Sequence, residues 1–450
     1  MTGHIKMYMK LYAIGGINVF EQLNFRVNFN NADYSDICFP DRDKMILREL
    51  GKQVAEIASR PIMEERKKLW IDHNSLKRTR PVLLCDPENG WNELIPESEI
   101  KCENSVARHW EDHLRKQIFW GNEMNDDYVV EPYFNLPYVY KEKPWGVAGS
   151  NKKGTEKKTK LDGGAYHIET ILEDYSQIKD ITKPQLDIDY KTTENLLELA
   201  HEIFDGYLNA RINTVWFWSF GLTDELVFLR GMDKLMYDFY DEPECVHEVM
   251  KILFEGTMER LDFLESNNLL CLNNDGSFVG SGGMGFTDEL PAEAFDGRVR
   301  TKDMWGLAES QVTVGISPGM FKEFIFPYQK KLMERFGLTC YGCCEPLDER
   351  IDIVKTVPNL RRVSVSPWAN KEVMSDKLKH DYIYSMKPSP SHLAVPKMDE
   401  ELVRKEIREA LRITRDNCVE IVMKDNHTLG NNPDNIKNWV RIVREEIESL

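Results

Sequence analysis

The chain has 450 residues, and Lys+Arg 58 against Asp+Glu 75 give it a formal net charge of −17. A surface this acidic repels phosphate backbones and anionic lipid headgroups, which excludes nucleic-acid and membrane-surface partners. No apolar run approaches the roughly 20 residues that span a bilayer, and residues 1–31 lack the pattern of a signal peptide. We therefore expect a cytoplasmic protein, whose nine cysteines are reduced thiols free to bind a metal or to react.

The first part of the chain predicts an α-rich layer. Residues 1–35 have no clear period and are expected to form an irregular extension. Apolar residues recur with helical spacing over 41–73 and again over 105–120, and the run at 80–85 is typical of a buried strand. Together these segments predict an N-terminal extension and helical layer over residues 1–125.

The remainder, residues 126–450, alternates between short apolar runs and longer stretches of helical period. Eight runs have the length of a strand: 128–133, 214–218, 269–273, 305–309, 338–342, 362–366, 382–386 and 419–423. Helices are expected between most of them, at about 190–210, 231–267, 317–336, 346–356, 371–379, 398–415 and 433–449. This alternation predicts an α/β protein with a (β/α)8 TIM barrel, and a doubly wound open sheet is the competing interpretation.

Two insertions interrupt this alternation. The segment 149–164 is rich in lysine and glycine, and the segment 276–297 contains Gly-Ser-Gly-Gly at 280–283. We expect the first to be a mobile loop and the second to fold over the mouth of the barrel.

Polar side chains follow the predicted strands, and in a barrel the carboxyl ends of the strands share one mouth where active sites form. The polar residues at these ends include Glu131, Tyr133, Asn135, Trp216, Trp218, Asn273, Asn274, Asp275, Glu309, Gln311, Tyr341, Cys343, Cys344, Glu345, Ser366, Trp368, Lys387, Lys424, Asp425 and His427. The sequence therefore predicts an active site built from several strands.

The strongest cluster is Cys-Tyr-Gly-Cys-Cys-Glu at 340–345. Vicinal thiolates at a strand end suit zinc, and His427 after the last predicted strand is a third ligand. Three ligands leave one position of a catalytic zinc open for substrate. The alternative is that Cys343 and Cys344 are buried thiols of the core.

Other residues are candidates for substrate binding. Trp216 and Trp218 alternate along a predicted strand and would form an aromatic wall, or else pack in the core. Lys387 would hold an anion or polarise an oxygen, Asn274 lies at a strand end, and His167 would donate a hydrogen bond unless it is structural. The chain has no Gly-x-Gly-x-x-Gly after a strand, no P-loop and no His-Glu-x-x-His, which argues against nucleotide-driven chemistry.

Four stretches of the chain resemble the uroporphyrinogen decarboxylase-like superfamily. They are Ser-Gly-Gly-Met-Gly-Phe-Thr-Asp-Glu-Leu-Pro at 281–291, Tyr-Gly-Cys-Cys-Glu-Pro-Leu at 341–347, Arg-Val-Ser-Val-Ser-Pro-Trp at 362–368 and Met-Lys-Asp-Asn-His-Thr at 423–428. The resemblance runs from about residue 41 to the end, and the branch it favours is the methyltransferase I components of anaerobic aryl-ether O-demethylases. It implies a (β/α)8 barrel and transfer of a methyl group from an aryl methyl ether to a corrinoid protein.

The chain departs from two other branches of that superfamily. The Arg-rich N-terminal segment of true decarboxylases has no convincing match, which makes a cofactor-independent decarboxylase a weaker alternative. Thiol methyltransferases hold zinc with His-x-Cys on one strand, whereas this chain has Tyr341-Gly342-Cys343 there. A methylcobamide:thiol methyltransferase is therefore also a weaker alternative, as is a protein that binds an aromatic ligand without turnover.

The favoured branch implies a specific chemistry. Co(I) of a corrinoid-binding partner protein attacks the ether methyl carbon, and the leaving phenoxide needs a proton or a Lewis acid. Zinc on Cys343, Cys344 and His427 would stabilise the developing charge, and Glu345 or Glu309 would complete its shell or donate a proton. Tyr341 would line the pocket of a small aromatic methyl ether.

Overall fold

The computed structural model describes residues 37–150, 155–157 and 166–450. Six parallel strands form its main sheet in the order β1, β16, β15, β14, β13, β12. Their bounds are β1 (Val82–Cys85), β12 (Trp305–Ala308), β13 (Leu338–Tyr341), β14 (Leu360–Val365), β15 (Ile383–Met386) and β16 (Cys418–Met423). Nearly every residue of these strands is buried, as in a parallel sheet covered on both faces. The α/β class and the last five predicted strands are confirmed.

The strand predicted over residues 80–85 is β1, and it lies in the main sheet beside the last strand of the chain. Val82 is opposite Glu420 and Cys85 is opposite Met423 in this parallel pair. The first and last strands are therefore neighbours. The hydrogen-bonded strand pairs of the described residues do not close the sheet, so the closed barrel stays a prediction. The domain division at residue 125 also stays a prediction.

One predicted strand is displaced along the chain, and two others are wrong. The strand near 128–133 is β2 (Tyr133–Leu136), which pairs in parallel with β9 (Asn209–Ile212). Residues 214–218 and 269–273 form no strand in the structure. A side chain takes the place of the second missing strand: the Trp305 amide donates to Asn273 Oδ1 at 2.9 Å, and Asn273 Nδ2 donates to the Trp305 carbonyl at 3.0 Å.

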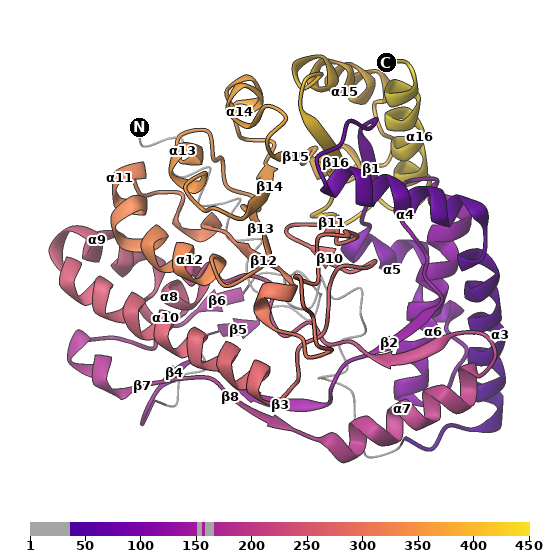
Figure 1. The fold of residues 1–450 in the computed structure, drawn as a ribbon, viewed down its shortest axis with the longest axis horizontal. Helices are drawn as coiled ribbons and strands as arrows, with labels where there is room; N and C mark the ends of the chain where they lie inside the picture. The colour runs from indigo at the N-terminus through magenta and orange to yellow at the C-terminus, as the bar shows by residue number, and fades with distance from the viewer. Residues whose placement is uncertain (1–36, 151–154, 158–165) are drawn as a thin grey trace.

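Helices surround the sheets and follow most of the predicted ranges (Figure 1). Prolines at positions 61 and 243 start new helices, which splits two long predicted helices into pairs. The helices are α3 (Asp41–Ala58), α4 (Pro61–Asn74), α5 (Trp91–Leu94), α6 (Ser105–Phe119), α7 (Tyr190–Phe204), α8 (Thr223–Arg230), α9 (Met232–Asp241), α10 (Pro243–Ser266), α11 (Pro318–Met320), α12 (Phe326–Met333), α13 (Ile351–Val354), α14 (Lys371–Leu378), α15 (Glu400–Ile413) and α16 (Asp434–Glu448).

The hairpin of β10 (Phe278–Val279) and β11 (Gly283–Met284) lies in the centre of Figure 1, against one face of the main sheet. Its glycines permit this approach. A Cβ atom at Gly280 would lie 2.8 Å from Cys340 Sγ, and one at Gly283 would lie 2.5 Å from the guanidinium carbon of Arg362. The insertion predicted to fold over a mouth therefore packs on the sheet itself.

Short antiparallel pairs lie apart from the main sheet, at the lower edge of Figure 1 or behind its centre. They are β3 (Tyr140–Lys143) with β8 (Gln185–Ile188), β4 (Gly146–Val147) with β7 (Ile181–Thr182), and β5 (Thr155–Lys157) with β6 (Tyr166–Ile168). The predicted extension at 1–35 lies outside the described residues, as does most of the loop predicted at 149–164.

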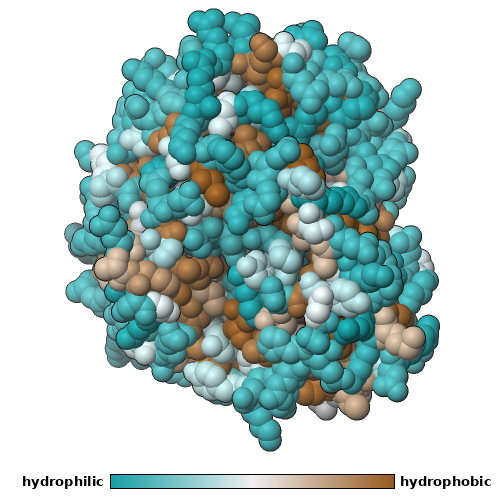
Figure 2. Space-filling model, turned by 45° about the vertical axis from the view of Figure 1, so that its right-hand side comes forward, coloured by the Kyte–Doolittle hydropathy of each residue, from teal (hydrophilic) through white to brown (hydrophobic). Residues whose placement is uncertain are grey.

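Within the described part, no helix is both long and apolar enough to cross a bilayer. Figure 2 shows a mostly hydrophilic face with scattered hydrophobic areas.

Candidate active site

The carboxyl ends of β12 and β13 bring together the residues that sequence spacing singled out. Glu345 joins the two ends, because its Oε1 accepts the Ser310 amide at 2.7 Å and its Oε2 accepts the Cys343 amide at 2.9 Å. Burial raises the pKa of the Glu345 carboxyl above its ordinary value, although both amides favour its charged form. Glu345 therefore fixes the turn that carries the two cysteines.

Cys343 and Cys344 lie beside residues from the end of β16. The two sulfur atoms are 3.5 Å apart, Lys424 Nζ donates to Cys343 Sγ at 3.4 Å, and Cys344 Sγ donates to Asp425 Oδ2 at 3.5 Å. Lys424 Nζ also lies 3.4 Å from Asp425 Oδ1. Two thiols thus share a small, partly buried site with one ammonium and one carboxylate.

The two thiols differ in acidity. The hydrogen bond between the two sulfur atoms, together with the Lys424 ammonium, lowers the pKa of the Cys343 thiol below its ordinary value. The same hydrogen bond raises the pKa of Cys344 well above that value, as do burial and Asp425. Cys343 is therefore the more acidic thiol of the pair, and the thiolate is the nucleophilic form of cysteine.

Glu309 occupies a cradle at the end of β12. Its Oε2 accepts the Gln311 amide at 2.8 Å, and its Oε1 accepts the Ser219 hydroxyl at 3.2 Å. A Cβ atom at Gly221 would lie 2.3 Å from Oε1, so the carboxyl packs directly on that glycine. Burial raises the pKa of Glu309 well above its ordinary value, and the charges of Asp224 and Glu345 raise it further. The protonated form of Glu309 is therefore favoured relative to that of an exposed glutamate.

Asp224 belongs to the same cluster of acidic side chains as Glu309 and Glu345, and the sequence analysis did not predict it. It lies in the first turn of α8, which packs against the turn that follows Glu309, and it is partly exposed. Burial raises the pKa of Asp224 to about 7, and Glu225 and Glu345 contribute through their charges. The spacing of the chain gives no signal for it, because α8 follows a segment without regular structure.

Tyr341 and Lys387 have other partners in the structure. The Tyr341 hydroxyl donates to Gln329 Oε1 at 2.7 Å, and the side chain is fully buried. Lys387 Nζ donates to Ser385 Oγ at 2.6 Å, and burial lowers its pKa to about 8. Both residues lie next to the site, and the polar end of each side chain is hydrogen-bonded to a neighbouring side chain.

The predicted aromatic wall is divided. Trp216 is buried, its indole N–H donates to the Leu269 carbonyl at 2.8 Å, and its ring packs on Tyr138 and Tyr140. Trp218 packs instead on the buried residues around the hairpin. Asn274 Nδ2 donates to the Leu290 carbonyl at 2.7 Å. The side chain of His167 lies outside the described residues.

The predicted zinc ligands do not converge. His427 is exposed, and its Nδ1 lies 3.4 Å from Asn89 Nδ2 rather than beside the thiols. Asp425 has a φ of 61° and redirects the chain immediately after β16. Among the residues that the structure describes, no three His, Cys, Asp or Glu side chains are grouped to hold a metal ion. Cys343, Cys344 and His427 are therefore not brought together as one ligand set in the structure.

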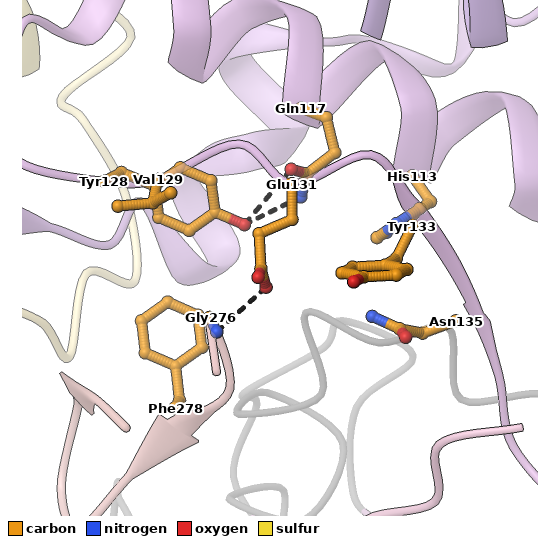
Figure 3. Close-up of a pocket in the computed structure, with 9 residues that line it drawn as sticks. All are labelled: His113, Gln117, Tyr128, Val129, Glu131, Tyr133, Asn135, Gly276 and Phe278. Carbon is orange, nitrogen blue, oxygen red and sulfur yellow. Dashed lines mark hydrogen bonds between the residues drawn. The ribbon is translucent and has the colours of Figure 1, made fainter. Parts of the chain in front are cut away.

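A separate polar cavity lies between α6, β2 and the hairpin (Figure 3). Its volume of about 40 Å³ has room for a few water molecules. Glu131 points across it, and its Oε2 accepts the Gly276 amide at 2.9 Å. The lining residues are His113, Gln117, Tyr128, Val129, Glu131, Tyr133, Asn135, Gly276 and Phe278. The predicted strand-end residues near 131–135 thus gather here, apart from the thiols.

No protein-family model matches the chain, and no curated protein matches it. Solved structures similar to it include a methyltransferase from Methanosarcina mazei, at 10% sequence identity and a TM-score of 0.43. That alignment covers 84% of this chain and 98% of the other chain. The resemblance to the uroporphyrinogen decarboxylase-like superfamily stays a prediction.

Proposed function

We propose that this protein is a methyltransferase that moves a methyl group from a methoxylated aromatic to the Co(I) of a corrinoid protein. One observation carries the proposal: Glu309 is a buried carboxylic acid, held at a strand end by Ser219, Gly221 and the Gln311 amide. An aryl methyl ether releases a poor leaving group unless its oxygen is protonated. A neutral acid at this position is suited to supply that proton.

Co(I) donates an electron pair to the methyl carbon, the carbon–oxygen bond breaks, and its electron pair goes to the phenolic oxygen. Glu309 gives its proton to that oxygen, which yields a phenol and methyl-Co(III). The partly exposed Asp224 then returns a proton from solvent to Glu309, because its pKa of about 7 allows it to gain and lose a proton near neutrality.

Glu309→Gln tests this role. The variant keeps the shape of the side chain but has no acidic proton, so methyl transfer to a reduced corrinoid protein is expected to fall about 100- to 10,000-fold. The loss should shrink when the ether releases a more acidic phenol, because that leaving group needs less help. The measurement is the rate of methyl-Co(III) formation followed by absorbance.

Glu323→Gln, at an exposed position, is the matched control and should retain the wild-type rate. A wild-type rate in Glu309→Gln, with the same response to the acidity of the phenol, would exclude Glu309 as the proton donor. Equal loss with every leaving group would indicate a role in binding instead.

Zinc on Cys343 and Cys344 stays a separate proposal, and no step above depends on it. The two thiols have suitable chemistry, but the Lys424 ammonium lies 3.4 Å from the Cys343 sulfur and already supplies a cation there. Zinc per chain in anaerobically purified protein tests the assignment, with Cys344→Ala and His427→Ala as variants. About one zinc in the wild type, lost in Cys344→Ala, would support it. Absence of zinc from the wild type would contradict it.

A further inference from the structure

Gln329 of α12 connects three segments of the site with one amide group. Its Nε2 donates to the Gly221 carbonyl at 2.7 Å and to the Glu309 carbonyl at 2.8 Å. Its Oε1 accepts the Tyr341 hydroxyl at 2.7 Å. The side chain is completely buried, so water does not compete for these bonds. The segment before α8, the end of β12 and the end of β13 therefore share one central partner.

The partners leave a single orientation for this amide. Two carbonyl oxygens need two N–H donors, and the tyrosine hydroxyl needs an acceptor, which an amide supplies together. A glutamate would lack the donors, and a methionine or leucine would lack both kinds of group. The chemistry of all three partners thus requires glutamine here.

These contacts bear directly on the proton donor. The Glu309 carboxyl packs on Gly221, and Ser219, two residues earlier, donates to the same oxygen. Gln329 holds the carbonyls of Gly221 and Glu309 at one point, so it fixes the distance between the acid and its cradle. We propose that Gln329 is a positioning residue, which acts through Gly221, Glu309 and Tyr341 to hold the acid in place. The role of Gln329 in catalysis rests on the proposed function, in which Glu309 is the proton donor.

The test follows the protonation of Glu309 and needs no turnover. The infrared C=O band of a protonated carboxyl is recorded as a function of pH in the full-length protein, and Glu309→Gln identifies the band of Glu309. Gln329→Met keeps the volume of the side chain and removes all three hydrogen bonds. We expect it to loosen the cradle, admit water and lower the pKa of Glu309 by about one unit or more. Tyr341→Phe removes one bond and should produce a smaller shift in the same direction.

Asn435→Leu is the matched control for lost stability. Asn435 is also a buried amide, and its Nδ2 donates to the carbonyls of Leu393, Val395 and Leu429 far along the chain from Glu309. It should destabilise the fold without moving the Glu309 band. An unchanged titration in Gln329→Met would overturn the inference. If that variant does not fold, an unchanged titration in Tyr341→Phe would overturn it equally.

The outcomes also separate this inference from the proposed function. A shifted Glu309 titration in Gln329→Met supports the positioning role even if Glu309→Gln retains full methyl transfer. An unshifted titration overturns the positioning role even if Glu309→Gln abolishes transfer. The two claims therefore stand or fall on different measurements.

Discussion

Lys424→Met is expected to raise the pKa of the Cys343 thiol and to reduce its thiolate at pH 7 by about tenfold or more, which corresponds to about one pKa unit. The reason is the contact of 3.4 Å between Lys424 Nζ and Cys343 Sγ, in which the ammonium favours the thiolate. The measurement is the rate of alkylation of Cys343 by a small reagent as a function of pH, with the modified residue located by mass spectrometry.

Two further variants test the direction of the pKa change and provide a control. Asp425 opposes the thiolate, so Asp425→Asn should lower the pKa of Cys343, and asparagine tolerates the φ of 61° at this position. Lys424→Arg keeps the charge and should stay near the wild type. Equal pH profiles in Lys424→Met and wild type would show that the ammonium does not control the thiol.

The second large effect, on stability, is expected from the buried cluster of Glu420, Arg362 and His73 next to the hairpin. Glu420 lies 2.9 Å from Arg362 Nε and 3.2 Å from His73 Nε2, and none of these side chains is appreciably exposed. Glu420→Gln leaves two buried cations without their shared counter-charge, so the free energy of unfolding should fall by about 3 to 5 kcal/mol. Denaturant unfolding at pH 6.5 measures the change.

Glu446→Gln is the matched control. Glu446 is also buried, but its partners Arg404 and Arg408 are 24% and 67% exposed, so solvent screens both ion pairs. That variant should cost about 1 kcal/mol or less. A similar, small cost in both variants would mean that the buried charges contribute little to stability.

The same group predicts a pH dependence. Burial alone would lower the pKa of His73, but Cys418 and Glu420 raise it to about 9 from an ordinary 6.5. A raised histidine pKa stabilises the fold fully below pH 6.5, and the contribution is lost as pH rises through about 9. Lys387, whose pKa falls to about 8, acts in the opposite direction above pH 8. Wild-type stability should therefore decline between pH 6.5 and 8, and Glu420→Gln should remove the part of that slope that His73 contributes.

The later part of the fold was predictable because its strands are continuous buried runs. The segments that end at Ala308, Tyr341, Val365, Met386 and Met423 are almost entirely buried and mostly apolar. Residues 269–273 have the same composition, yet they form no strand, since the Asn273 side chain bonds the backbone of Trp305 in place of a ladder. Composition does not distinguish these two arrangements.

The site was predictable where it follows strands and not elsewhere. Glu309, Cys343 and Glu345 come directly after β12 and β13, so strand ends located them. Asp224 and Gln329 belong to α8 and α12, and their approach depends on how those helices pack. The side chain of His427 lies beside Asn89 instead, and Asp425, two residues earlier, has a left-handed conformation that sequence spacing did not reveal.

Asn74, at the end of α4, has a consequence for biosynthesis. Its side chain donates to the carbonyls of Met284 and Phe286 in the hairpin segment, and it accepts from Arg362 at 2.7 Å. These partners lie 210 to 288 residues further along the chain. While the ribosome is still adding the last third of the protein, Asn74 and the hairpin have no sheet to pack on. We therefore expect co-translational folding to stop at partly formed helical layers, with the buried charges assembled after the final strands emerge.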